Sequence, residues 1–156
     1  MSADTILGVD PGTRFVGIAV MRGGVLVHSQ IRAFQGPWSI EKLKAIILSI
    51  DATITRYGVR KVAVKIPDVF PTSMGYNQLI GSLNVFCSSK GIKPSYYTLS
   101  EIKTGISKGE VQNSDALMQI IVLKHPELWL EYKKEQQNKN AHYHKLFHAI
   151  AAAHLL

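Results

Sequence analysis

Short apolar runs separated by polar turns fill the first part of the chain and predict three consecutive strands. The runs cover residues 6–9, 16–21 and 25–31, and each has an ordinary strand length. Arg22-Gly23-Gly24 separates the second run from the third, and two glycines in a short connection are typical of a β-hairpin turn. The chain is therefore expected to open with an antiparallel meander.

After Gly36-Pro37 the apolar positions change to a helical period. Ser39 is a good residue for a helix N-cap, and Gly58 is a good residue for the helix end. The apolar residues between them recur every three or four positions: Ile40, Leu43, Ile46, Ile47, Ile50 and Ile54. A long amphipathic helix is predicted here.

The rest of the chain alternates between strand-like and helix-like segments. Pro67 ends an apolar run, Gly91 follows a helical one, and Ser107-Lys108-Gly109-Glu110 has the form of a capping box. The predicted segments are a strand at 61–66, a helix at 76–89, a strand at 95–99, a helix from 107 to about 123, a polar loop at 133–140 and a helix at 141–155.

This order of elements predicts the fold class. A meander followed by strands that enter through helical crossovers indicates an α/β protein with a mixed five-stranded sheet and flanking helices. It is also the element order of the RNase H-like fold. We expect residues 1–156 to form one domain.

Composition narrows the classes of partner. The formal net charge is +7, and only 11 residues are acidic, which favours a polyanionic partner, nucleic acid before an anionic membrane. Cys87 is the only cysteine, so an internal disulfide and a cysteine-rich zinc module are excluded. The sequence has no signal segment and no apolar run long enough to span a membrane, which predicts a cytoplasmic protein.

The strongest candidate site is the turn after the first strand, Asp10-Pro11-Gly12-Thr13. Pro11 suits the second position of a tight turn, and Gly12 accepts a positive φ at low cost. Asp10 is thereby held at a strand end, where a metal ligand or a phosphate-binding group would stand. A simple hairpin with an Asp that caps its turn is the alternative interpretation.

Four segments together resemble the RuvC-type Holliday junction resolvases. They are Ile6 to Thr13 with Val16-Gly17, the strand Tyr57 to Val64, Ser107 to Gln112, and the helical stretch Lys145 to Ala151. Members of that family cleave four-way DNA junctions and use four side chains, mostly carboxylates, to hold two Mg²⁺ ions beside a DNA phosphate. The resemblance thus implies an RNase H-like fold, a branched DNA partner and a Mg²⁺ cofactor if the protein is active.

The resemblance carries over to the site residues only in part. Asp10 matches the first metal ligand, but the glutamate position falls on Lys65 and the pair in the last helix falls on Lys145 and His148. Lysine does not bind Mg²⁺, which prefers several oxygen ligands. Asp10 and His148 remain as metal candidates, and all four residues remain as candidates for a catalytic centre.

Two other residues, His144 and Asp68, are candidates to replace the missing metal ligands. His144 lies four residues before His148, so both share one helix face, although surface histidines in an alanine-rich helix would look the same. Asp68 follows the strand that carries Lys65 and could instead be a turn residue. Asp115 is expected to face solvent.

Other residues fit DNA binding better than chemistry. Phe70 resembles the family aromatic that stacks on an unpaired base, although an apolar loop anchor is the alternative. Candidates for phosphate contacts are Arg14, Lys103, Lys108, Lys133, Lys134 and Lys139, each of which could equally be a solvated surface charge. Lys65 and Lys145 are expected to converge on Asp10, where a lysine can substitute for metal charge beside a phosphate.

The sequence leaves two main hypotheses for function. In the first, the protein is a junction-binding relative with a degenerate site and doubtful cleavage. In the second, it is an active crossover junction endodeoxyribonuclease with an altered metal set. A sugar-kinase-like ATPase also shares an Asp-x-Gly-Thr loop but needs two such lobes. The helix at 76–89 resembles the family's dimer interface, which predicts a homodimer.

Overall fold

The first three strands form the predicted antiparallel meander. The computed structural model describes residues 3–69, 73–107, 113–138 and 142–156. Strand β1 (Thr5–Asp10) pairs with β2 (Phe15–Arg22), and β2 pairs with β3 (Val25–Ala33). Gly23 and Gly24 both have positive φ, as the tight turn between β2 and β3 requires.

Two further strands extend the sheet on the other side of β1. Strands β4 (Lys61–Ile66) and β5 (Ser95–Thr98) run parallel to β1 and give the sheet the order β3-β2-β1-β4-β5. The mixed five-stranded sheet predicted from the sequence is confirmed. Because β1 and β4 are parallel neighbours, Asp10 and Lys65 both lie near their carboxyl ends, at one edge of the sheet.

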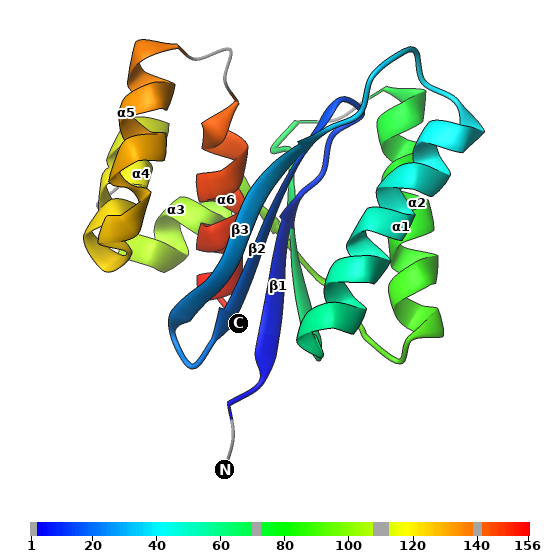
Figure 1. The fold of residues 1–156 in the computed structure, drawn as a ribbon, viewed down its shortest axis with the longest axis horizontal. Helices are drawn as coiled ribbons and strands as arrows, with labels where there is room; N and C mark the ends of the chain where they lie inside the picture. Colours follow the sequence, from blue (N-terminus) through cyan, green and yellow to red (C-terminus); the bar gives the residue numbers. More distant parts are fainter. Residues whose placement is uncertain (1–2, 70–72, 108–112, 139–141) are drawn as a thin grey trace.

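Helices α1 (Ile40–Tyr57) and α2 (Met74–Ser89) cover one face of this sheet (Figure 1). The Ser39 side chain accepts a hydrogen bond from the Lys42 backbone N–H, and Gly58 ends α1 with a φ of 63°, as predicted. The core on this face consists of buried aliphatic side chains of the strands and of these two helices, among them Val9, Ile18, Ile46, Ile50, Leu79 and Leu83.

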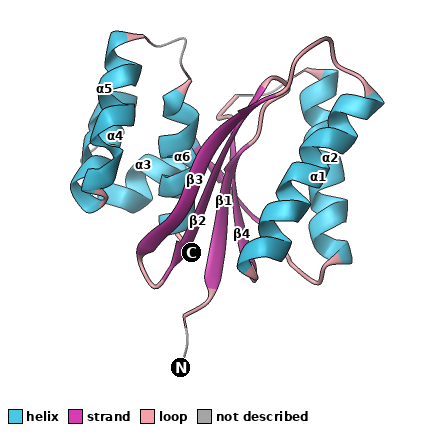
Figure 2. Cartoon of the chain, viewed as in Figure 1, coloured by secondary structure: helices cyan, strands magenta, loops and turns pink. Residues whose placement is uncertain are grey.

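The remaining helices cover the opposite face, as Figure 2 shows. They are α3 (Leu99–Ser107), α4 (Ser114–Lys124), α5 (Trp129–Gln137) and α6 (Tyr143–His154). Helix α6 lies directly against the sheet, while α4 and α5 pack outside it. Among the residues that the structure describes, no helix is both long enough and apolar enough to cross a membrane.

The predicted start of the helix at Ser107 is wrong. Ser107 is instead the last residue of α3, a helix that the sequence did not predict and that follows β5 directly. The Glu101 side chain accepts hydrogen bonds from the Thr98 backbone N–H and hydroxyl, which stabilises this start. Residues 108–110 of the expected capping box lie outside the described residues. Helix α4 begins after Asn113, whose side chain accepts from the Ala116 backbone N–H.

The polar loop predicted at 133–140 is also wrong over most of its length. Helix α5 extends to Gln137 because Tyr132 and Glu135, three residues apart, both turn inward and are buried. The charged residues between them made this amphipathic segment look like a loop. The last helix covers Tyr143–His154, slightly less than the predicted 141–155.

Candidate functional site

Two glycines let α6 approach the sheet closely. A Cβ at Gly8 would collide with the carbonyl oxygen of Ala149, and a Cβ at Gly17 would collide with that of Lys145. Because these positions carry no side chain, the backbone of α6 rests on β1 and β2. This close packing brings the first turns of α6 to the carboxyl end of β1, where Asp10 lies.

Asp10 is buried and bonded by two side chains of α6. Only 2% of the residue is exposed. Its Oδ1 accepts a hydrogen bond from the Lys145 ammonium at 3.2 Å, and its Oδ2 lies 3.3 Å from Nδ1 of His148. Both oxygens of the carboxylate are therefore engaged by nitrogen groups of this chain.

The environment keeps Asp10 ionised. Burial raises the pKa of its carboxyl, but the hydrogen bond from His148 and the positive charges of Lys145 and Lys65 outweigh burial, so the pKa lies below its ordinary value. Burial lowers the pKa of His148 more than Asp10 raises it, so the imidazole is neutral near pH 7. An ionised carboxylate only accepts hydrogen bonds, so Nδ1 of His148 carries the proton.

The turn after Asp10 differs in detail from the prediction. Gly12 does not have a positive φ in the structure. A Cβ at Gly12 would instead lie 2.6 Å from the Phe15 carbonyl oxygen and 3.2 Å from the Lys145 ammonium. The glycine is needed for space, first because of the Phe15 carbonyl oxygen and second because the Lys145 side chain passes this turn to reach Asp10.

A pocket of about 400 Å³ opens beside Asp10 at this edge of the sheet. Lys65 of β4 and Lys145 of α6 line it, together with Ser73 and Tyr76 at the start of α2. The positive charge of Lys65 acts on both Asp10 and His148. The structure thus brings together the four residues that the sequence singled out as a centre, while their roles stay a prediction.

The other predicted residues have other surroundings. Asp68 is exposed and accepts a hydrogen bond from the Ser100 backbone N–H at 3.1 Å. Arg14 is exposed, and Lys103 is half-buried on α3; neither lines the pocket beside Asp10. Phe70, Lys108 and Lys139 lie outside the described residues.

Lys133 and Lys134 of α5 and Asp115 of α4 are on the surface. Lys133 lies over the Trp129 ring at 5.3 Å, and Lys134 is exposed. Asp115 is exposed, as predicted, and accepts hydrogen bonds from Gln119 and Tyr132.

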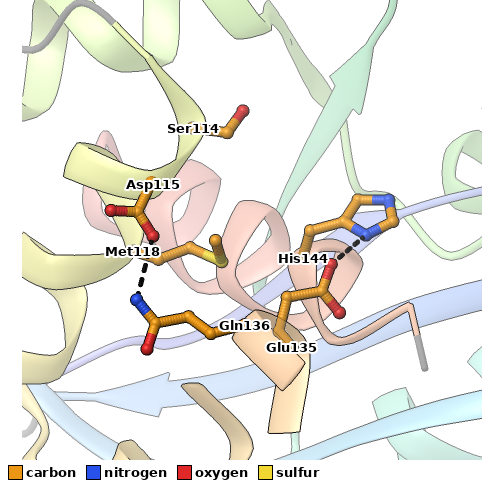
Figure 3. A pocket seen from close by; sticks show the side chains of 6 residues that line it. All are labelled: Ser114, Asp115, Met118, Glu135, Gln136 and His144. Atoms are coloured by element: carbon orange, nitrogen blue, oxygen red, sulfur yellow. Dashed lines mark hydrogen bonds and ion pairs between the residues drawn. The ribbon is translucent and has the colours of Figure 1, made fainter. Parts of the chain in front are cut away.

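His144 belongs to a second pocket, outside the Asp10 centre. This pocket of about 560 Å³ lies between α4, α5 and the start of α6 (Figure 3). His144 Nδ1 is 3.0 Å from an oxygen of the buried Glu135, and the other oxygen accepts from the Tyr143 backbone N–H at 2.9 Å. Glu135 therefore orients the first turn of α6, and His144 is directed toward it.

The residues of the Asp10 centre do not fit the pair of Mg²⁺ ions that the resemblance implies. Mg²⁺ prefers oxygen ligands in octahedral geometry. Asp10 supplies the only carboxylate of the centre, and one of its oxygens already faces an ammonium group. Among the described residues, no group of three or more His, Cys, Asp or Glu side chains is placed to hold a metal ion.

Sequence patterns do not single out Tyr76 or Glu135 as site residues. They predict only that Tyr76 lies in a helix that resembles an interface helix and that Glu135 lies in a loop. No local pattern identifies either residue. Tyr76 lines the pocket beside Asp10, and Glu135 contacts His144, only because helices that are distant in sequence pack together. The Ser73 side chain, which accepts from the Tyr76 backbone N–H, is the one local sign that α2 starts at the pocket.

One family model matches most of the chain. The sequence model described as "Crossover junction endodeoxyribonuclease RuvC" matches residues 6–141. No curated protein matches. Among solved structures, RuvC of Thermus thermophilus has a TM-score of 0.71 at 17% identity, over 96% of this chain and 90% of that chain. T. thermophilus RuvC in complex with a Holliday junction substrate has a TM-score of 0.70 at 16% identity, with the same coverage. These likenesses confirm the RNase H-like fold.

Proposed function

Because the chain belongs to the RuvC family of crossover junction endodeoxyribonucleases, we propose that it binds branched DNA, above all four-way junctions, without metal-dependent cleavage. The solved relative with a Holliday junction supports the choice of ligand, since the two chains share their fold. The net charge of +7 supports binding to a polyanion. A DNA ligand is compatible with the predicted cytoplasmic location, which stays a prediction.

One observation carries the proposal that cleavage is absent. The Lys145 ammonium lies 3.2 Å from Asp10 Oδ1, on the carboxylate that matches the first metal ligand of the family. Two unit charges about 4 Å apart interact by about 4 kcal/mol near a protein surface. A divalent cation that approached Asp10 would meet this repulsion from Lys145 and a further one from Lys65.

The alternative is an active endonuclease with an altered metal set. Asp10 Oδ2 and His148 Nδ1 lie 3.3 Å apart, and a single ion could bind both only after Nδ1 lost the proton that it donates to Asp10. This alternative requires the Lys145 side chain to leave Asp10 and further ligands to come from water or from DNA.

A junction assay tests the proposal. The protein should bind a synthetic four-way DNA junction in EDTA more tightly than a linear duplex of the same sequence, and its affinity should fall steeply with salt. With Mg²⁺ or Mn²⁺, the strands should remain intact under conditions in which the T. thermophilus enzyme serves as positive control. Cleavage by the unmodified protein that Asp10→Asn abolishes would establish the alternative. Equal affinity for junction and duplex would contradict the choice of ligand.

We also propose that the protein is a homodimer joined through α1 and α2. A largely apolar groove runs between the two helices, lined by Leu43, Lys44, Ile47, Leu48 and Ser82. Val85 of α2 is 69% exposed, and Gly81 has open space where a Cβ would stand. An apolar, closely approachable face supports a second copy as its partner, and two-fold symmetry suits a four-way junction.

A further inference from the structure

The pocket beside Asp10 carries a surplus positive charge. Its charged lining groups are Asp10, Lys65 and Lys145. Asp10 and Lys145 form an ion pair and compensate each other, while Lys65 makes no ion pair within 4 Å among the described residues. Asp68 feels the charge of Lys65, but it is exposed, lies beyond ion-pair distance and does not line the pocket. The charged groups of the lining are therefore two cations and one carboxylate, and Lys65 is the cation without a partner in the lining.

The pocket also presents hydrogen-bond donors from three elements. The Lys145 ammonium has three N–H groups and gives one of them to Asp10. The Tyr76 hydroxyl stays protonated, because burial and then the charge of Asp10 raise its pKa well above the ordinary range. The first turn of the sixteen-residue helix α2 borders the pocket through Ser73 and Tyr76, and the helix dipole is positive at that end.

The geometry points to a metal-free binding site for one backbone phosphate of DNA, formed by Lys65, Lys145 and Tyr76. The two ammonium groups supply the positive charge that metal ions supply in a cleaving enzyme, and the tyrosine hydroxyl adds a neutral donor. Asp10 is a positioning residue in this site, because it holds the Lys145 ammonium at the pocket wall. The inference rests on the proposed function and names the chemical group that the centre recognises.

The position of Lys145 supports this role for Asp10. The Lys145 side chain is only 16% exposed and crosses the turn at Gly12, where a Cβ would touch it. An extended, partly buried lysine has lost most of its side-chain entropy before any ligand arrives, so the ammonium is preorganised for an anion. A merely structural ion pair would not require a second cation, Lys65, in the lining of the same pocket.

The strand β4 offers a matched pair of variants for the test. Lys65 and Lys61 are lysines of the same strand, and Lys61 lies at its other end, where it pairs with exposed Asp4. In EDTA, Lys65→Gln should lower the affinity for a four-way DNA junction about tenfold and lower the slope of log K against log salt by about one. Lys61→Gln removes the same charge and should change neither quantity.

Two further variants separate the phosphate contact from an effect on folding. Lys65→Arg keeps the charge and the donors and should restore the affinity to within about threefold of the unmodified protein. Tyr76→Phe keeps the ring and removes only the hydroxyl donor, so affinity should fall about fivefold while the salt slope stays the same. Thermal unfolding of each variant would show whether it is folded.

The outcomes distinguish the inference from the proposed function. If the unmodified protein does not bind junctions, both the proposed function and the phosphate site are wrong. If it binds them and folded Lys65→Gln behaves like Lys61→Gln, only the phosphate site is wrong. Junction affinity that rises on addition of Mg²⁺ at constant ionic strength, and that Lys65→Gln increases, would also overturn the metal-free site.

Discussion

At the scale of single residues, the centre is defined by one carboxylate with nitrogen neighbours. Asp10 is buried, ionised and bonded to Lys145 and His148. A buried charge is tolerated only when such partners compensate it, so removal of Lys145 or His148 would leave an uncompensated carboxylate and destabilise the fold. The same contacts occupy the oxygens that a metal ion would need.

Restoring carboxylates should restore metal binding. We expect Lys65→Glu combined with His148→Asp to increase Mn²⁺ affinity, and the addition of Lys145→Asp to increase it further, because each change replaces a cation or an imidazole with oxygen ligands. The combined change should strengthen binding by at least about tenfold, since close unit charges near a protein surface interact by several kcal/mol. Calorimetric titration of the folded variants with Mn²⁺ measures this.

Lys61→Glu is the control for this experiment, because it introduces a carboxylate at the far end of the same strand. It should leave Mn²⁺ binding at the level of the unmodified protein. Tight Mn²⁺ binding by the unmodified protein, lost in Asp10→Asn, would show that the present donor set already suffices and that Lys145 does not exclude the ion.

At the scale of elements, the position of α6 decides which side chains meet Asp10. Helix α6 begins after His142, which has a φ of 62° and stacks on the Phe15 ring at 3.9 Å. Glu135 of α5 then accepts from the Tyr143 backbone N–H. These contacts and the close approach at Gly8 and Gly17 orient the helix, so that Lys145 and His148 face the strand end.

A methyl group on β2 should displace α6. Gly17→Ala would place a Cβ against the Lys145 carbonyl oxygen, so we expect a loss of about 1–3 kcal/mol in the free energy of unfolding. Gly81→Ala in α2 is the control, because its Cβ would meet no atom within 4 Å. That variant should gain up to about 1 kcal/mol from the higher helix propensity of alanine.

Chemical denaturation measures both glycine variants. Because Lys145 moves with α6, the folded Gly17→Ala protein should also bind junctions more weakly. Gly81→Ala is a control for stability alone, because Gly81 lies on the proposed dimer face. Equal stability of the two variants would mean that α6 does not depend on the close approach at β2.

At the scale of the whole molecule, the two helix layers have different surfaces. The α6 side contributes Lys145 and His148 to the Asp10 centre, and the α1–α2 side carries an apolar groove with open space at Gly81. In a two-fold dimer through α1 and α2, each copy would retain its own Asp10 centre. Two such centres match two DNA strands of a junction.

A charged residue on the α1–α2 face should separate the copies. Val85→Asp should convert the dimer to a monomer in sedimentation measurements, because it buries an unpaired carboxylate at the interface. Leu123→Asp on α4 is the control: Leu123 is also exposed, at 81%, but lies on the other helix layer, so that variant should remain dimeric. A monomeric unmodified protein at micromolar concentration would contradict the proposed dimer.

The local pattern of apolar and polar residues predicts most strands and helices. It fails for segments that are stabilised by packing against residues distant in sequence. The strands β1 to β4 and the helix α1 follow from apolar runs, glycine turns and the caps Ser39 and Gly58, all of which act within a few residues. The sequence predicts a loop where α5 lies, because the residues of α5 that face inward contact α4 and α6, which are separate segments. It does not predict α3, because α3 follows β5 directly and no turn residues separate the two.

The fold family, the excess of positive charge and the lack of the carboxylates that two Mg²⁺ ions require could all be predicted before the structure. These depend on residue identity and on short-range periodicity, which the chain carries directly. Three-dimensional packing was needed to show that Lys145 and His148 bond to the two oxygens of Asp10 and that Tyr76 lines the same pocket. It also shows that Gly12 leaves room for the Phe15 carbonyl and the Lys145 side chain. Asp10 and Lys145 are 135 positions apart, and their distance depends on how closely a helix packs on a sheet, which no local pattern encodes.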